Sequence, residues 1–314
     1  MRALIALGGN AMTGPDGSAT PEDQDRAVAA AMEHVADLIA SGLDVVLTHG
    51  NGPQVGNLLV KNELAAHVVP PVPLDWCGAQ TQGTIGLLIM DSLDQKLAAR
   101  GIDKPVAALI TRTLVDGDDP GFTKPTKPIG RYLPEAEARV LMEHGQTWEG
   151  RGDKGWRRVV ASPEPLEILD APAIELLSDT GYVVVGAGGG GIPVVRDPDG
   201  TLRGVEAVID KDLAAALLAR AVGADVLVIA TDVDNAVLSY GTPDARPLER
   251  VTPAQMREYA AAGHFASGSM GPKVEAAVRF IEAGGTRSAI TSLQRIPEAV
   301  HGSAGTIVEV QQSD

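Results

Sequence analysis

The sequence predicts an α/β protein with a mostly parallel central sheet and helices on both faces. The main observation is that predicted strands alternate with predicted helices along most of the chain, as in parallel sheets with crossover helices. A second is that two apolar runs end in glycine-rich loops, at residues 8–10 and 50–52, as buried parallel strands do. A third is that residues 112–165 are dense in charge, Gly and Pro, which predicts a protruding insert of hairpins with one helix near 135–143.

The elements before the insert follow from local signals. The first strand covers residues 3–7, and a helix then begins after Thr20, where a cap, a proline and two acids mark its start, and ends near Gly42. The second strand covers residues 43–48 and continues through His49 into the second glycine loop. The remaining elements expected there are helices at 53–66 and 78–100 and a strand at 105–111.

The alternation resumes after the insert. The expected helices begin near 172 and cover 213–222, 253–262 and 272–283. The expected strands cover 182–185, 226–231, 288–291 and 306–310, with a glycine run at 188–191 and a hairpin turn at 197–200.

Composition narrows the class of protein. The chain has 314 residues, 44% of them hydrophobic, and a net charge of −15, which argues against nucleic acid and anionic membranes as partners. No apolar run approaches the roughly 20 residues of a membrane span, and no secretory signal precedes the first strand. The single cysteine, Cys77, cannot form an intrachain disulfide and is interpreted as a small buried hydrophobe. We expect a cytoplasmic protein.

The two glycine loops predict a ligand. They are Gly8-Gly9-Asn10 and Gly50-Asn51-Gly52, and both should lie at the carboxyl edge of the sheet, where open α/β sheets bind ligands. Glycine lets backbone N–H groups approach a phosphate closely. A small, anionic, phosphorylated ligand is therefore expected there.

Three lysines stand out against the acidic background. Lys127 lies in the Gly- and Pro-rich stretch 124–130 of the insert, whereas Lys211 and Lys273 lie at predicted helix starts. Helix N-termini favour anions, so a lysine there suits an anion shared by the side chain and the backbone N–H groups. Each lysine alone is best interpreted as solvated, but the set of three favours a site, where Asp212 could hold one of them in place.

The glycine run after the strand at 182–185 has two interpretations. Residues 186–191 satisfy G-x-G-x-x-G, and Glu206 lies 20 residues beyond Gly186. A hairpin follows instead of a helix, which disfavours a nicotinamide-dependent dehydrogenase. The run, with Gly189 and Gly190, lets the backbone approach an acceptor or a γ-phosphate, or it is a tight connection.

Other chemical motifs are few. The sequence contains no P-loop, no H-E-x-x-H, no paired C-x-x-C and no G-x-S-x-G. His49 adjoins a candidate loop, and a structural role is preferred for it. Thr231-Asp232-Val233-Asp234 ends a predicted strand and could hold magnesium or a ribose, although an Asx-type turn is an equally good interpretation.

These clusters, in this order, resemble the carbamate kinase branch of the amino acid kinase family. The similar stretches are ALGGNA (6–11), THGNGPQVG (48–56), LDWCGAQTQGTIG (74–86), KPTKPIG (124–130), GWRRVVASPEP (155–165), GGGGIPV (188–194), EAVIDKDLAA (206–215), TDVD (231–234), GSMGPKVEAA (268–277) and ITSL (290–293). The resemblance implies a three-layer αβα sandwich with a protruding subdomain at about 112–165, in a homodimer. It further implies an N-terminal lobe, 1–208, for carbamate or carbamoyl phosphate and a C-terminal lobe, 209–314, for the nucleotide.

The same resemblance implies roles for individual residues. Lys127 would reach down from the subdomain, Lys211 and Lys273 would neutralise phosphates, and Asp212 would orient the lysines. The residues implied for the phosphoryl group and acceptor are Gly8, Gly9, Asn10, Gly50, Asn51, Gly52, Gly189 and Gly190, and those implied near the nucleotide are Asp232, Met270 and Gly271. The activity implied is reversible phosphoryl transfer between ATP and carbamate with Mg²⁺, making ATP in arginine catabolism, without a protein-bound metal.

Two departures from the family pattern matter. Ala161 stands where proline is common, and Asn235-Ala236-Val237 stands where Gly-Val-Tyr is common, with the tyrosine near adenine. The phosphate chemistry is untouched, but the nucleotide preference stays open. An enzyme of the same fold that phosphorylates another small carboxylate, and a nucleotide-binding regulator without turnover, are the alternatives.

The proposed chemistry agrees with the residue types. Carbamate and ADP are both anionic near neutral pH, so neither nucleophile needs a base to remove a proton. Phosphoryl transfer between anions is catalysed mainly by positioning and electrostatics. Lysines, glycine N–H groups and magnesium meet that demand.

Overall fold

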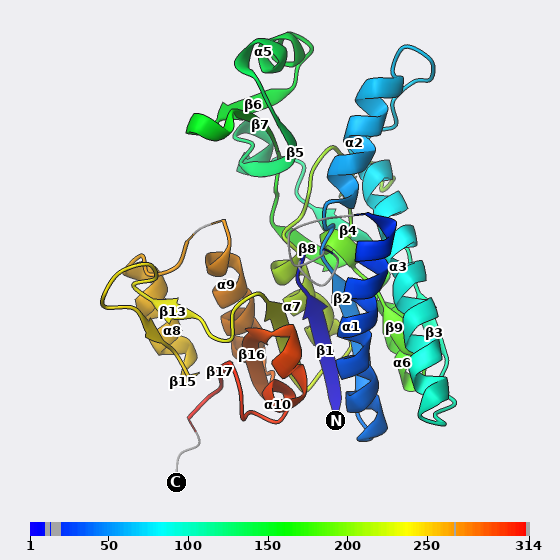
Figure 1. Ribbon diagram of the computed structural model, residues 1–314, viewed down its shortest axis with the longest axis vertical. Coiled ribbons are helices and arrows are strands. Elements are labelled where there is room, and N and C mark those ends of the chain that lie inside the picture. The colour runs from blue at the N-terminus through cyan, green and yellow to red at the C-terminus, as the bar shows by residue number, and fades with distance from the viewer. Residues whose placement is uncertain (10–12, 14–19, 267, 312–314) are drawn as a thin grey trace.

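The computed structural model describes residues 1–9, 13, 20–266 and 268–311. Its centre is an eight-stranded sheet in which β1 (Arg2–Leu7) lies between β2 and β12 (Figure 1). In order across the sheet, the strands are β15 (Arg250–Val251), β17 (Thr306–Val308), β16 (Arg287–Ser292), β12 (Val226–Thr231), β1, β2 (Asp44–His49), β9 (Val183–Val185) and β3 (Val106–Ala108). Every pairing from β16 to β3 is parallel, whereas β17 runs antiparallel to β16. The predicted mostly parallel sheet is confirmed.

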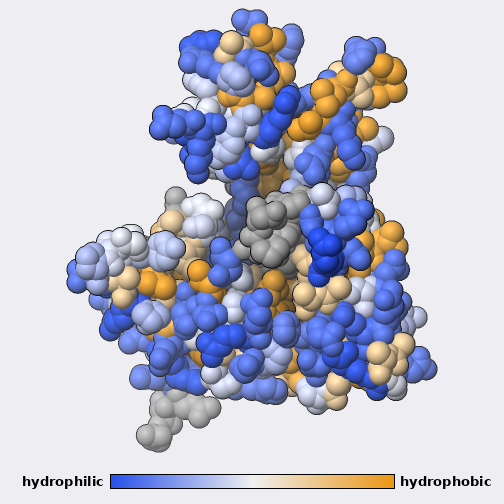
Figure 2. Space-filling model, viewed as in Figure 1, coloured by the Kyte–Doolittle hydropathy of each residue, from blue (hydrophilic) through white to orange (hydrophobic). Residues whose placement is uncertain are grey.

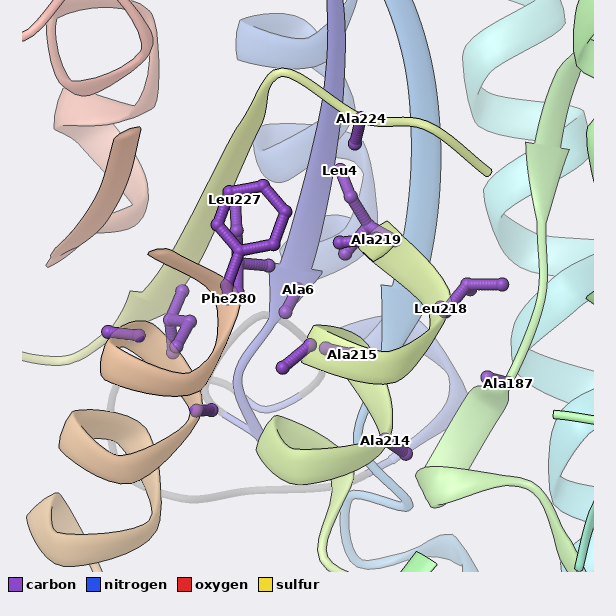
Figure 3. Packing of buried hydrophobic residues seen from close by; sticks show 14 of the residues in the cluster. Leu4, Ala6, Ala187, Ala214, Ala215, Leu218, Ala219, Ala224, Leu227 and Phe280 are labelled. Atoms are coloured by element: carbon purple, nitrogen blue, oxygen red, sulfur yellow. The ribbon is translucent and has the colours of Figure 1, made fainter. Parts of the chain in front are cut away.

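Helices cover both faces of this sheet. Successive side chains of a strand point to opposite faces, and β1 shows the consequence: Ala3 and Ile5 pack in one apolar cluster, Leu4 and Ala6 in the other. The first cluster includes α1 (Pro21–Ala40), α3 (Leu74–Ala99) and α10 (Ile296–Val300), and the second includes α6 (Ala171–Asp179), α7 (Lys211–Ala221), α8 (Pro253–Ala261) and α9 (Met270–Glu282). Figure 3 shows Leu4 and Ala6 facing the small side chains of α7. The three-layer αβα sandwich is confirmed.

Two smaller sheets extend from the sandwich. One contains β11 (Leu202–Gly204), β10 (Ile192–Arg196), β4 (Arg112–Val115) and β8 (Pro165–Ile168). The other contains β5 (Lys127–Leu133), β7 (Trp156–Val160) and β6 (Thr147–Gly150), packed with α5 (Glu135–Glu143). We call residues 127–160 the protruding subdomain, because in Figure 1 they stand away from the main sheet, beside the upper part of α2 (Gln54–Ala65). The described residues also form α4 (Pro120–Thr123) and the short pair β13 (Val237–Leu238) and β14 (Arg246–Pro247).

Several helix starts show how local capping decides their position. The Oγ1 atom of Thr20 accepts from the N–H of Asp23 at 3.2 Å, and α1 begins at the next residue, Pro21, as expected. Helix α7 begins two residues earlier than expected, because the side chain of Asp210 caps it. Helix α9 begins at Met270, so Pro272 is its third residue and not its first.

The strand expected at 105–111 is shorter than the sequence suggested. The chain pairs in the main sheet as β3 only over Val106–Ala108, and it re-enters a sheet as β4 at Arg112. Between these strands, the backbone N–H of Thr111 donates to the side chain of Gln82 at 2.8 Å instead of to a neighbouring strand. Helix α3 is longer than expected and begins at Leu74, and helix α10 was not anticipated.

The surface is largely hydrophilic, with apolar side chains gathered in a few places. Figure 2 shows one such place where α2 and the turn after it stand free, at the upper right. Leu64, Val68 and Val69 are exposed there. In the part of the chain that the structure describes, no helix combines the length and apolar character needed to cross a membrane.

Candidate active site

The main cavity lies at the carboxyl ends of β1 and β2 and has a volume of about 600 Å³. Gly9 and the loop 50–52 form its wall at the sheet edge, as parallel strands are expected to deliver their loops there. The protruding subdomain contributes Lys127 from above, and the starts of α7 and α9 contribute Lys211 and Lys273. The structure therefore brings the three lysines that the sequence singles out to one cavity.

Asp212 organises two of these lysines. Its Oδ2 atom lies 2.9 Å from Nζ of Lys273, and its Oδ1 atom accepts from Nζ of Lys211. Asp212 is the second residue of α7 and Lys273 the fourth of α9, so the ion pairs also join the two helix starts. The third lysine, Lys127, binds Oδ2 of Asp210 at 2.8 Å.

The electrostatics of this cluster keep Asp212 charged. Burial alone would raise the pKa of Asp212, but the ammonium groups of Lys211 and Lys273 outweigh it and lower the pKa to about 2. Burial also lowers the pKa of Lys211, against the attraction of Asp212 and together with the repulsion of Lys273. The cluster presents three ammonium groups against two carboxylates, which leaves room for an incoming anion.

Glycines shape the wall of the cavity. A Cβ at Gly50 would lie 3.2 Å from Cδ of Lys211, so glycine there gives the lysine side chain its path along the loop. A Cβ at Gly189 would lie 1.9 Å from Oδ1 of Asn51, and Gly189 has a φ of +66°. The glycine run after β9 thus accommodates Asn51 of the second loop, and both residues line the cavity.

Other glycines of the predicted set are placed differently. A Cβ at Gly8 would lie 2.7 Å from the carbonyl oxygen of Ala230, and one at Gly190 would lie 2.9 Å from that of Ile209. Both positions allow close backbone packing, and neither residue is among those lining the main cavity. The N–H of Gly271 already donates to a backbone carbonyl within the loop before α9. Asn10 lies outside the described residues.

A second cavity of about 210 Å³ adjoins the first, and both are lined by Ser269 and Lys273. Its other lining residues are Thr231, Asp232, Val233, Asn235, Val237, Tyr240, His264, Phe265, Ala266 and Met270. Asp232 therefore faces this cavity, whereas Asp234 of the same stretch accepts from the hydroxyl of Ser292 and lies 3.9 Å from Arg295. Side by side, the cavities can hold a two-part ligand with its anionic part against Lys273.

His49 lies beneath the main cavity. It is buried, its Nδ1 donates to the carbonyl oxygen of Gly50 at 2.7 Å, and burial lowers its pKa to about 4. A Cβ at Gly188 would lie 2.3 Å from its Nε2. The neutral imidazole thus supports the second loop and the glycine turn.

The sequence did not predict the residues that anchor the glycine turn at 188–190. The amide of Gln82 donates to the carbonyl of Gly188 at 2.9 Å, and the hydroxyl of Thr48 donates to that of Ala187 at 3.0 Å. The hydroxyl of Thr113 donates to the carbonyl of Gly190 at 2.8 Å. Their only signal in the sequence is a polar residue on an otherwise buried element. Asp210 belongs to the stretch 206–215 that carries the family resemblance, but its pairing with Lys127 was not predicted.

Lysines and glycine loops at the carboxyl edge of an αβα sandwich, beside a second cavity, form the arrangement of a small-molecule kinase. The chain belongs to the amino acid kinase family, whose model matches residues 1–292. It is similar to the carbamate kinase of Thermococcus kodakarensis, with 47% identity over 311 residues that cover 98% of each chain. It is also similar to carbamate kinase 1 of Enterococcus faecium, with 46% identity over 94% of each chain. Among solved structures, carbamate kinase from Giardia lamblia bound to AMP-PNP is 42% identical, with a TM-score of 0.93 over 98% of each chain.

Proposed function

We propose that this protein is a carbamate kinase, which transfers a phosphoryl group reversibly between ATP and carbamate and forms ADP and carbamoyl phosphate. The observation that carries the proposal is the convergence of Lys127, Lys211 and Lys273 on one cavity at the sheet edge. The names of the full-length relatives support carbamate as the acceptor.

The cavity residues would divide the work by position. Lys273 lines both cavities and would meet the phosphate chain where the nucleotide passes from one to the other. Lys211 would bind the transferred group through its ammonium group, beside the N-terminus of α7, whose N–H groups at Asp212 and Leu213 stay capped by Asp210. Backbone N–H groups of Gly9, Asn51 and Gly52, with Gly189, would surround the acceptor, and Gly50, whose N–H donates to the carbonyl of Leu7, would line the wall beside it. Asp232 and Met270 would contact the nucleoside in the second cavity.

The reaction needs no proton acceptor in this site. A carbamate oxygen attacks the γ-phosphorus of ATP, a new P–O bond forms, and the bond to the ADP oxygen breaks. Asp212 is a poor base, because both of its oxygens accept from ammonium groups and its pKa is about 2. The site instead offers fixed positive charge to the transferring group, the main source of catalysis in phosphoryl transfer.

Magnesium is best described as part of the nucleotide substrate. The two carboxylates of the main cavity, Asp210 and Asp212, are both engaged by lysines. Among the described residues, no group of three or more His, Cys, Asp or Glu side chains could hold a metal. Mg²⁺ would therefore be bound chiefly by the phosphate oxygens and would neutralise part of their charge.

The division of the chain follows from this arrangement. Residues 1–208 would form the lobe for carbamate or carbamoyl phosphate, with an insert at about 112–165 that contains the protruding subdomain, and residues 209–314 the lobe for the nucleotide. Carbamoyl phosphate is a strong phosphoryl donor, so ATP synthesis in arginine catabolism is the physiological direction we favour. A free, buried Cys77 agrees with a cytoplasmic location.

A homodimer would cover exposed apolar side chains on α3. Trp76 and Leu87 are 60% and 52% exposed, and residues eleven positions apart lie on the same face of a helix. Ile110, just beyond the edge strand β3, is 53% exposed as well. Association surfaces are enriched in exposed apolar side chains such as these. Light scattering of the wild type and of Trp76→Glu tests the proposal, which requires a dimer that the substitution dissociates.

The test of the function is ATP formation from carbamoyl phosphate and ADP, with and without Mg²⁺. Turnover that requires Mg²⁺ would support a carbamate kinase. Turnover only with another small carboxylate in the forward direction would identify a different kinase of the same family. Nucleotide binding without any turnover would identify a regulator.

A further inference from the structure

The ion pair between Lys127 and Asp210 joins the protruding subdomain to the sandwich. Lys127 is the first residue of β5, and Asp210, 83 positions later in the chain, caps α7. The Nζ atom lies 2.8 Å from Oδ2. The pair therefore links the roof of the main cavity to the helix start at its floor.

Asp210 uses its two oxygens for different purposes. Oδ1 accepts from the N–H groups of Asp212 at 2.9 Å and Leu213 at 3.4 Å, which caps the helix. Oδ2 accepts from Lys127. The carboxylate thus offers Lys127 a negative oxygen at a helix N-terminus, where phosphate groups bind in many proteins.

The three lysines of the cavity differ in how firmly they are held. The side chains of Lys211 and Lys273 are 15% and 13% exposed, and that of their partner Asp212 is 4% exposed. The side chains of Lys127 and Asp210 are 33% and 15% exposed. An ion pair that water reaches contributes little free energy and breaks easily. Removing one partner from a buried ion pair costs several kcal/mol, because it leaves a buried charge unpaired. Lys127 is therefore the ammonium group that can exchange its partner most readily.

We propose that Asp210 is a positioning residue, which holds Lys127 over the cavity in the free protein and yields it to a phosphoryl oxygen of the bound substrate. This inference rests on the proposed function. The exchange needs no proton transfer, because the ammonium group trades one negative oxygen for another. Asp210 keeps its capping bonds through Oδ1, so α7 is undisturbed while the subdomain closes on the substrate.

Competition for Lys127 predicts an unusual kinetic effect. Asp210→Asn keeps an oxygen that can cap the helix but loses the negative charge. The KM for carbamoyl phosphate should fall about three- to fivefold, the range set by a partly exposed ion pair. In a Lys127→Ala background the same substitution should change KM less than twofold, because the contested ammonium group is gone. A purely structural or long-range electrostatic role would give the same shift in both backgrounds.

A matched control is available in the same subdomain. Arg158 of β7 lies 3.5 Å from Glu206 of the sandwich and is not among the residues lining the main cavity, so Glu206→Gln removes another ion pair of the subdomain without touching Lys127. Its KM for carbamoyl phosphate should stay within twofold of the wild-type value. Hydrogen exchange of the free protein gives a second measurement, and Asp210→Asn should raise exchange in β5–β7 about as much as Lys127→Ala does.

The outcomes separate the two proposals. Any of three results would overturn the role of Asp210. The first is a KM that is unchanged or raised in Asp210→Asn, and the second is an equal fall of KM in the Lys127→Ala background. The third is unchanged hydrogen exchange in β5–β7 of Asp210→Asn. If the wild type forms no ATP from carbamoyl phosphate, the proposed function fails. The hydrogen-exchange comparison then decides alone whether Asp210 holds the subdomain through Lys127.

Discussion

The replacement Asp212→Asn tests the charge cluster at the centre of the cavity. The pKa of Asp212 is lowered from 3.8 to about 2 in the folded protein, which corresponds to about 2.5 kcal/mol of stability at neutral pH. Asparagine keeps the size of the side chain but leaves Lys211 and Lys273 without their counter-charge. Breaking a buried ion pair from one side costs about 3–5 kcal/mol. We expect a loss of about 3 kcal/mol in the free energy of unfolding.

Chemical unfolding at several pH values measures this loss. The carboxylate stabilises the folded state above its unfolded pKa of 3.8, and that contribution disappears as the pH falls toward 2. The difference between wild type and variant should therefore be constant from pH 7 to pH 5 and shrink below pH 4. Asp179→Asn, which removes an ion pair with Arg2 whose carboxylate is 58% exposed, should cost less than about 1 kcal/mol. Equal unfolding free energies for wild type and Asp212→Asn would refute the reasoning.

Three further predictions concern the surroundings of the cluster. Gly189→Ala places a methyl group against Asn51 at a φ of +66°. The free energy of unfolding should therefore fall by about 1–2 kcal/mol, and KM for carbamoyl phosphate should rise. An unchanged KM would contradict the packing of Gly189 against Asn51. Burial lowers the pKa of His49 from 6.5 to about 4, so between these values mainly the unfolded state takes up the proton. Through this residue, the free energy of unfolding of the wild type should therefore fall by about 3 kcal/mol from pH 7 to pH 4. His49→Gln should flatten that part of the pH profile of unfolding. Tyr240→Ala should raise KM for ADP about tenfold by removing an aromatic surface from the second cavity, with little change in the melting temperature; an unchanged KM would exclude Tyr240 from base binding.

Local sequence signals were sufficient for much of the fold. The cap at Thr20 and the proline after it place the start of α1, and the apolar runs before the two glycine loops place β1 and β2. These features depend on neighbours within a few positions, which a single sequence displays. Where a capping role was not recognised, as with Asp210, the predicted helix start was two residues too late.

The geometry of the site depends on contacts between distant positions. Lys273 meets Asp212 across 61 positions, and Gln82 reaches the carbonyl of Gly188 across 106. No local spacing encodes such pairings, because they arise only when the sheet brings the loops together. The same reason explains why Tyr240 was not connected with the second cavity. The three lysines could be selected as unusual, but their partners could not.

One measurement tests most directly the claim that the lysines of the main cavity catalyse phosphoryl transfer. It is the rate of ATP formation from carbamoyl phosphate and ADP in the wild type, Lys211→Ala and Lys273→Ala. Loss of about 4 kcal/mol of transition-state stabilisation corresponds to about a thousandfold in rate. We predict Mg²⁺-dependent turnover by the wild type and rates lower by about that factor in both variants, with unchanged circular dichroism. Near wild-type turnover by both variants would contradict the account.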